Sequence, residues 1–272
     1  MRVCIIGSGL SALTLAKALV NQNIFVDIVS LTKNYKIHES RTIGISKSNF
    51  EYFNRNIVKI EKIIWKLNKI EIYSDNLKNE KLLNFENKND QLFSIVKNFE
   101  IYKKINKSLL KNKFFKKIKS KKKINTDQYN LIVITDYNSP LAKKFFNKKI
   151  VKKYNSEAYT TIIHHEKIPN EVATQIFTKK GPIAFLPISK NKTSVVYSIH
   201  KLKNKANIDI NKLIHQYNIK YKIKKIDKIN FFDLKFFVLR SYYNKNILAF
   251  GDLLHRIHPL AGQGFNMTIR DI

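Results

Sequence analysis

A short motif near the N-terminus has the residue types and spacing of a turn that binds a dinucleotide. Gly7-Ser8-Gly9-Leu10-Ser11-Ala12 follows an apolar run, residues 2–6, and precedes a helical pattern of apolar residues, 10–21. In such a motif the first glycine permits a tight turn, and the second lets the backbone approach a pyrophosphate. A small third residue lets the helix pack on the strand. The N–H groups of the helix N-terminus then face the phosphates. We therefore predict dinucleotide binding here; the alternative is a glycine-rich turn without a ligand.

The next apolar run, residues 25–29, completes a strand–helix–strand unit of the kind that parallel sheets require. An acidic residue is expected at its end, where it would accept hydrogen bonds from ribose hydroxyls. Ser30 stands there instead, and Asp27 lies earlier in the strand. We expect Ser30 to bind the ribose, more weakly than a carboxylate would, and a different strand register would bring Asp27 to this place.

A second chemical pattern lies at the other end of the chain, over residues 248–271. A strand ends at Asp252, whose carboxylate can accept a hydrogen bond from a ribityl hydroxyl. Pro259 introduces a rigid turn, and Gly262 and Gly264 allow the backbone to approach a flat ring closely. The helix that begins near Asn266 would point its positive end at the part of a flavin that gains negative charge on reduction.

These residues resemble the FAD-dependent aromatic hydroxylases related to para-hydroxybenzoate hydroxylase. The family pattern is Gly-Asp-Ala-Ala-His, then Pro, Gly-Gln-Gly, Asn and Asp. The chain keeps Gly251, Asp252, His255, Pro259, Gly262, Gln263, Gly264, Asn266 and Asp271. The resemblance implies that most of these residues contact FAD.

Other segments extend the resemblance toward the ubiquinone-biosynthesis hydroxylases. Residues 39–46 resemble a family segment whose arginine contacts FAD, which implies that role for Arg41; the alternative is a surface arginine. Residues 173–187 resemble the sheet and loop of the substrate domain. Phe185 and Pro187 are therefore candidates for the substrate side of the flavin, although Pro187 would also fit an ordinary strand end.

The chain departs from the family pattern at three positions. After the apolar strand 129–135, the family has an Asp-Gly pair that serves FAD and NAD(P)H; here Asp136 is kept and the glycine is Tyr137. If that position requires a positive φ, a tyrosine there costs about 1 kcal/mol or more. Leu253 and Leu254 replace two alanines, and we expect them to crowd the ribityl chain.

The resemblance implies an α/β fold with α+β elements: a Rossmann-like FAD-binding domain interleaved with an antiparallel-sheet substrate domain. We assign residues 1–75, 101–152 and 241–272 to the first domain. Residues 76–100, as a hairpin, and 153–240 belong to the second. Within these ranges we expect strands at 69–73 and 91–96 and helices at 101–113 and 208–217. We expect a solvated loop at 116–123, where the alternative is a lysine-rich turn or strand edge.

The implied function is that of an FAD-dependent monooxygenase. It would use NAD(P)H and O₂, through a flavin C4a-hydroperoxide, to hydroxylate a polyprenylated phenol in ubiquinone biosynthesis. The flavin carries this chemistry, so we name no catalytic side chain, and we predict no metal site. The alternative is a non-catalytic FAD-binding subunit of a quinone-biosynthesis complex.

Composition adds a strong positive charge. Lys and Arg total 51 and Asp and Glu total 20, which gives +31 over 272 residues. Abundant Lys, Asn and Ile fit an AT-rich coding sequence, and the charge also predicts attraction to anionic membrane surfaces. No nucleic-acid motif accompanies it, so we expect no specific nucleic-acid partner.

The location follows from what the sequence lacks. No apolar run approaches the roughly 20 residues that span a bilayer, and we read the N-terminus as a mature strand instead of a signal peptide. Cys4 is the single cysteine, predicted to be buried. We expect a cytoplasmic protein, peripheral on the inner face of the membrane, with other quinone-biosynthesis proteins as partners. Because the last helix stops at Ile272, we also expect the chain to be a fragment.

Overall fold

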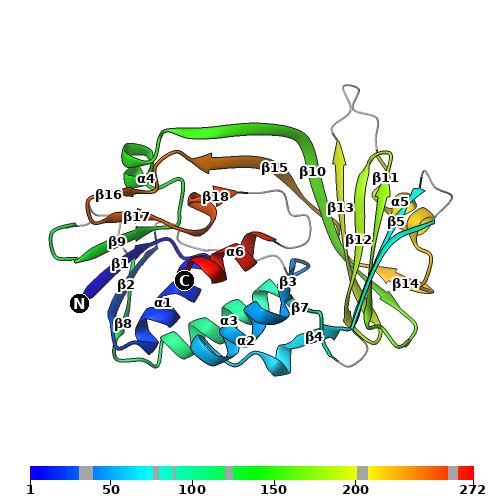
Figure 1. The fold of residues 1–272 in the computed structure, drawn as a ribbon, viewed down its shortest axis with the longest axis horizontal. Helices are drawn as coiled ribbons and strands as arrows, with labels where there is room; N and C mark the ends of the chain where they lie inside the picture. The colour runs from blue at the N-terminus through cyan, green and yellow to red at the C-terminus, as the bar shows by residue number, and fades with distance from the viewer. Residues whose placement is uncertain (31–38, 76–79, 88–89, 120–124, 201–207, 257–262) are drawn as a thin grey trace.

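The apolar runs at the N-terminus and at residues 131–134 pair as neighbouring parallel strands in the computed structural model (Figure 1). The structure describes residues 1–272 except 31–38, 76–79, 88–89, 120–124, 201–207 and 257–262. Six described strands form this sheet: β1 (Arg2–Ile6), β2 (Phe25–Ser30), β8 (Phe115–Lys119), β9 (Leu131–Ile134), β16 (Tyr243–Asn244) and β17 (Ile247–Ala249). Their order is β16-β17-β9-β1-β2-β8, and all neighbours are parallel except β16 and β17.

Helices cover both faces of this sheet because each of its central strands is apolar on both sides. Val3 and Ile5 pack in one core with α1 (Leu10–Asn21), α2 (Lys47–Asn56) and α3 (Asn98–Leu109). Cys4 and Ile6 pack in a second core with α4 (Pro140–Phe145). The last helix, α6 (Gln263–Asp271), lies beside α1 near the middle of the molecule (Figure 1).

The second sheet is larger and mostly antiparallel. Its strands are β5 (Lys69–Ser74), β6 (Lys81–Glu86), β10 (Lys149–His165), β11 (Val172–Thr178), β12 (Gly181–Ser189), β13 (Lys192–His200), β14 (Ile223–Ile226), β15 (Asn230–Leu239) and β18 (His255–Arg256). The order is β18-β15-β10-β13-β12-β11-β5-β6, with β14 beside β10. β10 begins near α4, runs alongside β15 and then bends into the sheet, so one strand joins the two parts of the molecule (Figure 1).

A small sheet and one helix complete the arrangement. β3 (Thr42–Ser46), β4 (Ile64–Leu67) and β7 (Phe93–Lys97) form an antiparallel sheet in the order β3-β7-β4, preceded at β4 by the short turn η1 (Glu61–Ile63). Leu67 and Ile95 of this sheet pack against Leu186 and Ile188 of β12. The opposite face of the large sheet is covered by α5 (Ile210–Tyr217), which begins with Asp209 accepting a hydrogen bond from the Lys212 N–H.

The predicted fold class is confirmed, and several local expectations are wrong. β5 was expected to form an antiparallel strand or hairpin, but it belongs to the large sheet and pairs in parallel with β11. Residues 115–119 form the edge strand β8, where a solvated loop was expected, and residues 120–123 lie outside the described part. β15 was not predicted. The division into domains at residues 75, 100, 152 and 240 stays a prediction.

A buried ionic group lies on the α4 side of the parallel sheet. The Asp27 carboxylate accepts hydrogen bonds from Arg2 Nε at 2.9 Å and from the Tyr129 hydroxyl at 2.9 Å. Arg2 Nη2 lies 2.7 Å from the same oxygen. Beside this group Cys4 is fully buried, as expected from the sequence. Burial, helped by the charge of Asp27, raises the pKa of the Cys4 thiol to about 12.

The raised pKa predicts that Cys4 is inert in the folded protein. The thiolate is the reactive form, and at about pH 8 it should be nearly absent from the native state. A thiol reagent with a chromophoric leaving group should therefore label Cys4 only as fast as the protein unfolds, and fully in denaturant. Complete labelling within the mixing time in native buffer would contradict the burial of this strand.

Candidate dinucleotide-binding site

The turn between β1 and α1 requires glycine at its first position. Gly7 has φ of +132°, and its N–H donates a hydrogen bond to the Val29 carbonyl at 3.0 Å. A side chain on Gly7 would collide with Thr135 Oγ1, which lies directly over the turn. The Thr135 hydroxyl is itself held by the Ile6 carbonyl at 3.2 Å. The predicted tight turn is thus enforced by both backbone angle and space.

The N-terminus of α1 is open to an anion. Gly9 is the N-cap with extended backbone, no side chain caps the helix, and the first turn has no acidic residue. Leu10 and Ala12 face the core at 7% and 0% exposure, so Ser8 and Ser11 carry the polar side of the motif. A helix end with this arrangement offers N–H groups and a positive dipole end to phosphate oxygens.

The ribose position is occupied by serine, as the sequence indicated. Ser30 ends β2, and its hydroxyl donates to Ser8 Oγ at 3.3 Å. Asp27 cannot exchange with it by a change of register, because Asp27 pairs with Cys4 and is bound to Arg2 and Tyr129. The two serines therefore define this end of the candidate site.

The two glycine-containing motifs, far apart in the chain, meet at Gly251. This residue has φ of +61° and opens the 3-10 turn η3 (Gly251–Leu253). An added Cβ would lie 2.7 Å from Ser11 Cβ and 2.9 Å from Ser11 Oγ. Because real Cβ atoms do not come so close, only glycine fits between η3 and α1. Asp252, the next residue, is exposed.

The start of α6 is open on one side. Gly264 lies in the helix, and an added Cβ would meet no atom of the described residues within 4 Å. Fold packing therefore gives no reason for a glycine here, whereas a ligand that needs close backbone approach would. Gln263, the first residue of α6, is exposed. Pro259 and Gly262 lie outside the described residues.

Asn266 was expected to contact a ligand, and in the structure its buried side chain binds neighbouring elements of the protein. Its amide donates to the Gly44 carbonyl at 2.8 Å and accepts from the Ser46 N–H at 3.1 Å. Asn49 Nδ2 donates to the same amide oxygen at 2.8 Å. The buried side chain thus ties α6 to β3 and α2, and it orients the helix that carries Gly264. Asn49 was not predicted, since nothing in its local sequence marks it.

Arg41 lies where the small sheet meets the large one. Its guanidinium carbon is 5.6 Å from the centre of the Phe232 ring on β15. On either side of it, Asn230 Nδ2 donates to Ser40 Oγ at 3.0 Å and Thr42 donates to Ser194 Oγ at 2.9 Å. These contacts place the Arg41 segment against the face of the large sheet that α5 does not cover.

A polar cavity of about 330 Å³ adjoins this junction. It is lined by Glu39, Ser40, Lys97, Ile162, His164, Lys192, Asp227, Lys228 and Asn230. His164 Nε2 lies 3.0 Å from Asp227 Oδ2. Burial raises the pKa of the Asp227 carboxyl, but the hydrogen bond and charge of His164 outweigh it and the pKa lies below its usual range.

The middle motif does not carry the strain that the sequence suggested. Within the described residues the non-glycine positive φ angles are at Asn23, Asn155 and Lys245, so Tyr137 has an ordinary backbone. Asp136 accepts a hydrogen bond from the Asn138 N–H at 2.9 Å and shapes the turn that leads to α4. The expected cost of a tyrosine here is therefore absent.

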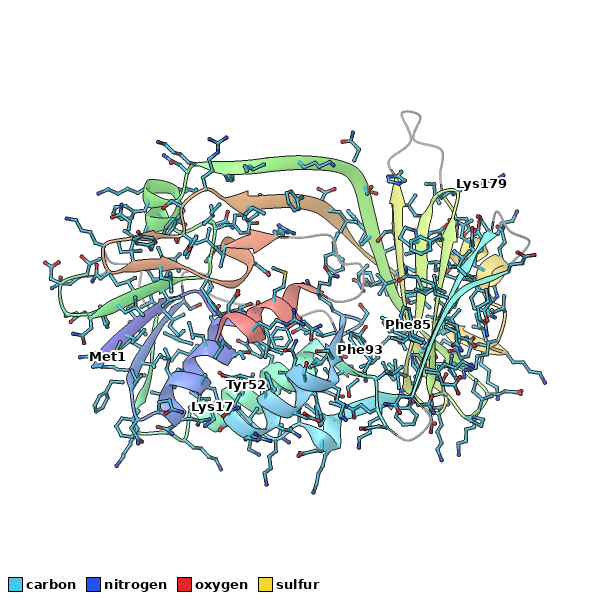
Figure 2. All side chains as sticks on the ribbon, in the orientation of Figure 1. Met1, Lys17, Tyr52, Phe85, Phe93 and Lys179 are labelled. Atoms are coloured by element: carbon cyan, nitrogen blue, oxygen red, sulfur yellow. The ribbon has the colours of Figure 1, made fainter. Side chains whose placement is uncertain are left out.

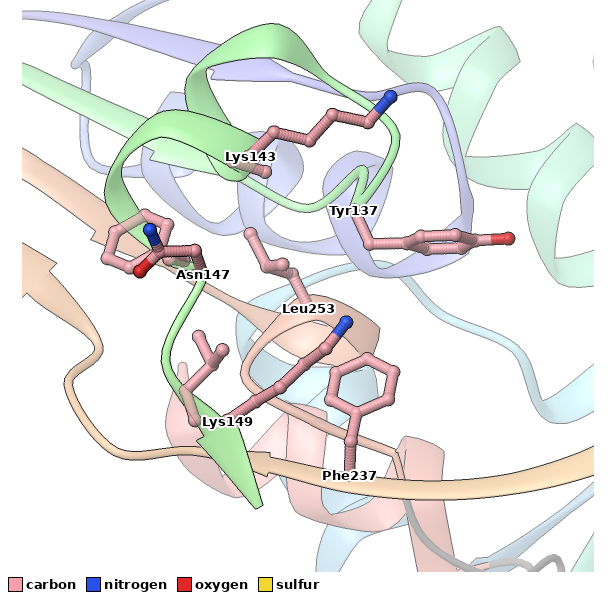
Figure 3. A pocket seen from close by; sticks show the side chains of 9 residues that line it. Tyr137, Lys143, Asn147, Lys149, Phe237 and Leu253 are labelled. Atoms are coloured by element: carbon pink, nitrogen blue, oxygen red, sulfur yellow. The ribbon is translucent and has the colours of Figure 1, made fainter. Parts of the chain in front are cut away.

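Two of the departures from the family pattern line one cavity of about 200 Å³ (Figure 3). Tyr137 and Leu253 line it together with Phe237 of β15, Lys143 and Lys149 (Figure 3). Leu253 is 2% exposed and packs in the core on the α4 side. The expected crowding of a ribityl chain by Leu253 is wrong, because the side chain turns into this core. Leu254 contributes its carbonyl to the Leu239 N–H at 3.2 Å.

Phe185 and Pro187 do not face the candidate site. Phe185 is buried in the core beneath α5, with its ring 6.0 Å from that of Tyr221. Pro187 is also buried, two residues along the same strand and hence on the same face. The structure places both on the face of the large sheet that α5 covers, and their assignment to the substrate side stays a prediction. The alternate residues Leu186 and Ile188 face the small sheet instead.

Two further features of the described part bear on function. It contains no group of three His, Cys, Asp or Glu side chains that could hold a metal ion. None of its helices has the length and apolar character needed to cross a membrane.

Comparison with known proteins gives several relatives that are named as ubiquinone-biosynthesis monooxygenases or as a ubiquinol hydroxylase. The human ubiquinone biosynthesis monooxygenase COQ6 is 26% identical over 190 residues, which are 54% of this chain and 41% of that protein. The Escherichia coli 3-demethoxyubiquinol 3-hydroxylase is 28% identical over 127 residues, or 44% of this chain and 32% of the relative. The chain thus spans less than half the length of these curated relatives. No family model matches it.

Solved structures share the fold. The Pseudomonas putida p-nitrophenol 4-monooxygenase PnpA aligns with a TM-score of 0.76 at 13% identity, covering 99% of this chain and 76% of that one. Klebsiella pneumoniae HpxO, complexed with FAD and uric acid, aligns with a TM-score of 0.76 at 13% identity, covering 100% and 77%. Sequence and fold together confirm the resemblance to the FAD-dependent aromatic hydroxylases and their ubiquinone-biosynthesis branch.

The contact between the two motifs can be tested by a double-mutant cycle. Gly251→Ala should lower the free energy of unfolding by about 2–4 kcal/mol, from the Cβ collision with Ser11 and the left-handed backbone. Ser11→Gly removes the colliding atoms, so the double variant should recover at least about 1 kcal/mol relative to the sum of the single changes. Urea unfolding measures all four proteins. Additive losses within about 0.5 kcal/mol would show that the two residues do not touch.

Proposed function

We propose that this chain, a relative of the ubiquinone-biosynthesis monooxygenases with the fold of the FAD-dependent monooxygenases, binds FAD across the β1–α1 turn and the η3–α6 segment. The observation that carries the proposal is the contact of Gly251 with Ser11. It places the β1–α1 turn beside the second glycine motif, although Ser11 and Gly251 lie 240 positions apart in the sequence.

The residues present fit this cofactor. The N-terminus of α1 would hold the pyrophosphate through its N–H groups and dipole. Ser30 would meet the adenosine ribose, Asp136 would lie beside the phosphates, and Asp252 would accept from the ribityl chain. The open surface at Gly264 would receive the flavin ring, next to the positive end of α6. Arg41 would contact FAD from beside β3, and its contact with the Phe232 ring gives it a defined orientation.

We infer that the whole protein is a monooxygenase that hydroxylates an aromatic ring, with a polyprenylated phenol as substrate. FAD, when bound, supplies the redox chemistry that activates O₂, with NAD(P)H as electron donor. One oxygen atom enters the ring and the other leaves as water. One relative is named a ubiquinone biosynthesis monooxygenase and another a 3-demethoxyubiquinol 3-hydroxylase, which supports a prenylated phenol.

In this reaction the chain would bind FAD and the substrate, orient them toward each other and exclude water from the site. The face of the large sheet that α5 leaves uncovered lies against the Arg41 segment and closes one side of the junction. The net charge of +31 supports a peripheral position on an anionic membrane, where such a substrate would reside. We place the protein on the inner face of the cytoplasmic membrane, together with other quinone-biosynthesis proteins.

A second candidate is an FAD-binding subunit that does not turn over. The observation in its favour is the half-exposed Tyr137 side chain, which stands at the turn where the family sequence pattern has the glycine that serves NAD(P)H. Leu253, which also departs from the pattern, lines the same cavity. This candidate keeps the FAD site and loses the electron donor. The two candidates therefore differ in reduction by NAD(P)H and agree on FAD binding.

Gly264 provides the sharpest test of the FAD site. Because an added Cβ there meets no atom in the described part of the chain, Gly264→Leu should leave the unfolding temperature unchanged or slightly higher. It should nevertheless weaken FAD binding by at least about tenfold, since a leucine fills the space the ring would occupy. Quenching of FAD fluorescence measures the affinity.

Arg270→Leu is the matched control, because it places the same side chain at an exposed position near the other end of α6. It should bind FAD as the unaltered chain does. Equal FAD affinity of the Gly264 and Arg270 variants would remove Gly264 from the site.

Turnover distinguishes the two candidates. With FAD bound, adding NADPH or NADH together with a short-chain prenylphenol should bleach the oxidised flavin and yield a hydroxylated prenylphenol by mass spectrometry. Oxidation of NAD(P)H should rise several-fold on adding the phenol. Stable FAD binding with no reduction by either nucleotide would favour the non-catalytic subunit, and turnover of soluble benzoates alone would contradict the prenylphenol assignment.

A further inference from the structure

The outer strand of the large sheet is exposed on both faces and unusually apolar for a sheet edge. β6 ends the strand order and pairs only with β5 among the described strands. All six of its residues are exposed, including Leu82 at 43%, Leu83 at 53% and Phe85 at 51% (Figure 2 labels Phe85). Free edges usually carry central charges, proline or a covering element, because an unprotected edge is a template for another strand.

The charge of β6 is balanced although the chain as a whole carries +31. Its four central residues are uncharged, and its two terminal charges are paired within the sheet. Lys81 Nζ lies 2.7 Å from Glu71 Oε1, and Glu86 Oε2 lies 3.4 Å from Lys69 Nζ. Within β6 itself, a second copy of the chain would therefore meet no uncompensated lysine.

The backbone pattern fixes how two such edges could pair. The Asn87 N–H donates to the Asn68 carbonyl, and Ile70 lies opposite Phe85. Along an antiparallel ladder the hydrogen-bonding residues alternate, so Leu83 and Phe85 direct their backbone toward β5, and Asn84 and Glu86 direct theirs outward.

We propose that β6 pairs antiparallel with β6 of a second copy of this chain, about a two-fold axis at Asn84. In an isologous contact the axis passes between identical residues, and Asn84 can exchange N–H and C=O with Asn84 of the second copy. Leu83 then lies opposite Phe85 of the second copy, in the closer, non-hydrogen-bonded type of pair. Leu83 and Phe85 stand beside Ile72 and Ile70 of β5, so the apolar row continues across both copies.

The dimer is expected to be weak and strengthened by salt. A register irregularity between Ile72 and Tyr73 leaves Leu82 out of the ladder and limits the pairing to a few residues. Such a contact buries less than the roughly 1,200 Å² of stable interfaces. Because two chains of +31 repel each other, screening should favour association.

Sedimentation velocity from about 5 to 300 μM, in about 0.1 and 0.5 M salt, tests the proposal. We expect a monomer–dimer equilibrium that tightens at the higher salt. Asn84→Pro removes an outward N–H and leaves the β5 pairing intact, so it should weaken the dimer at least about tenfold. Asn84→Ala, the matched control, keeps the N–H and should dimerise as before. A monomer under all conditions overturns the proposal.

Cysteine cross-linking tests the register and remains informative if the proline variant misfolds. A mixture of Leu83→Cys and Phe85→Cys chains should form disulfide-linked dimers several-fold faster than either variant alone, because residue 83 of one copy faces residue 85 of the other. Leu110→Cys, at an equally exposed leucine on another element, should not cross-link. Cys4 is buried and does not interfere. Equal rates in the mixture and the single variants overturn the register. Slow amide exchange of Asn84 in dilute monomer, showing that another segment covers the edge, overturns the pairing.

Discussion

The close contact of η3 with α1 at Gly251 is the constraint on which the site depends. It requires a left-handed backbone and the absence of a side chain at one residue, and in return it holds the end of β17 against the first turn of α1. The start of α6 follows from there and is held from the other side by Asn266, which binds β3 and α2. Two glycine turns from opposite ends of the sequence thus meet at the start of α1, and α6 packs beside them.

The parts of this arrangement that the sequence predicts are those set by local chemistry. The strand–turn–helix at Gly7 follows from glycine spacing and apolar periodicity, and Asp252 follows from the end of a strand. The partner of Gly7, Thr135, could not be predicted, because it reaches the turn through the pairing of β1 with β9. The parallel pairing of β5 with β11 is equally non-local, since it joins residues about 100 positions apart.

The contacts that the structure shows at Phe185 and Asn266 could not be predicted from the sequence, for a common physical reason. On a strand, successive side chains face opposite sides, so the assignment of Phe185 to the substrate side required knowing which face α5 covers. Asn266 was assigned to the ligand from its motif, but a short amide near a helix start can equally bind neighbouring backbone. At Tyr137 the sequence predicted strain that the observed backbone angles do not show. In each case the residue type suggested a role, but tertiary packing determined where the side chain points and which backbone angles the residue adopts.

The central claim is that the two motifs form one FAD site. Titration of the purified chain with FAD, followed by the change in the flavin absorption bands and by isothermal calorimetry, measures this most directly. The account predicts saturable binding of one FAD per chain, with a perturbed flavin spectrum and a raised unfolding temperature. A spectrum that stays that of free FAD, with no heat of binding and no thermal shift, would contradict it.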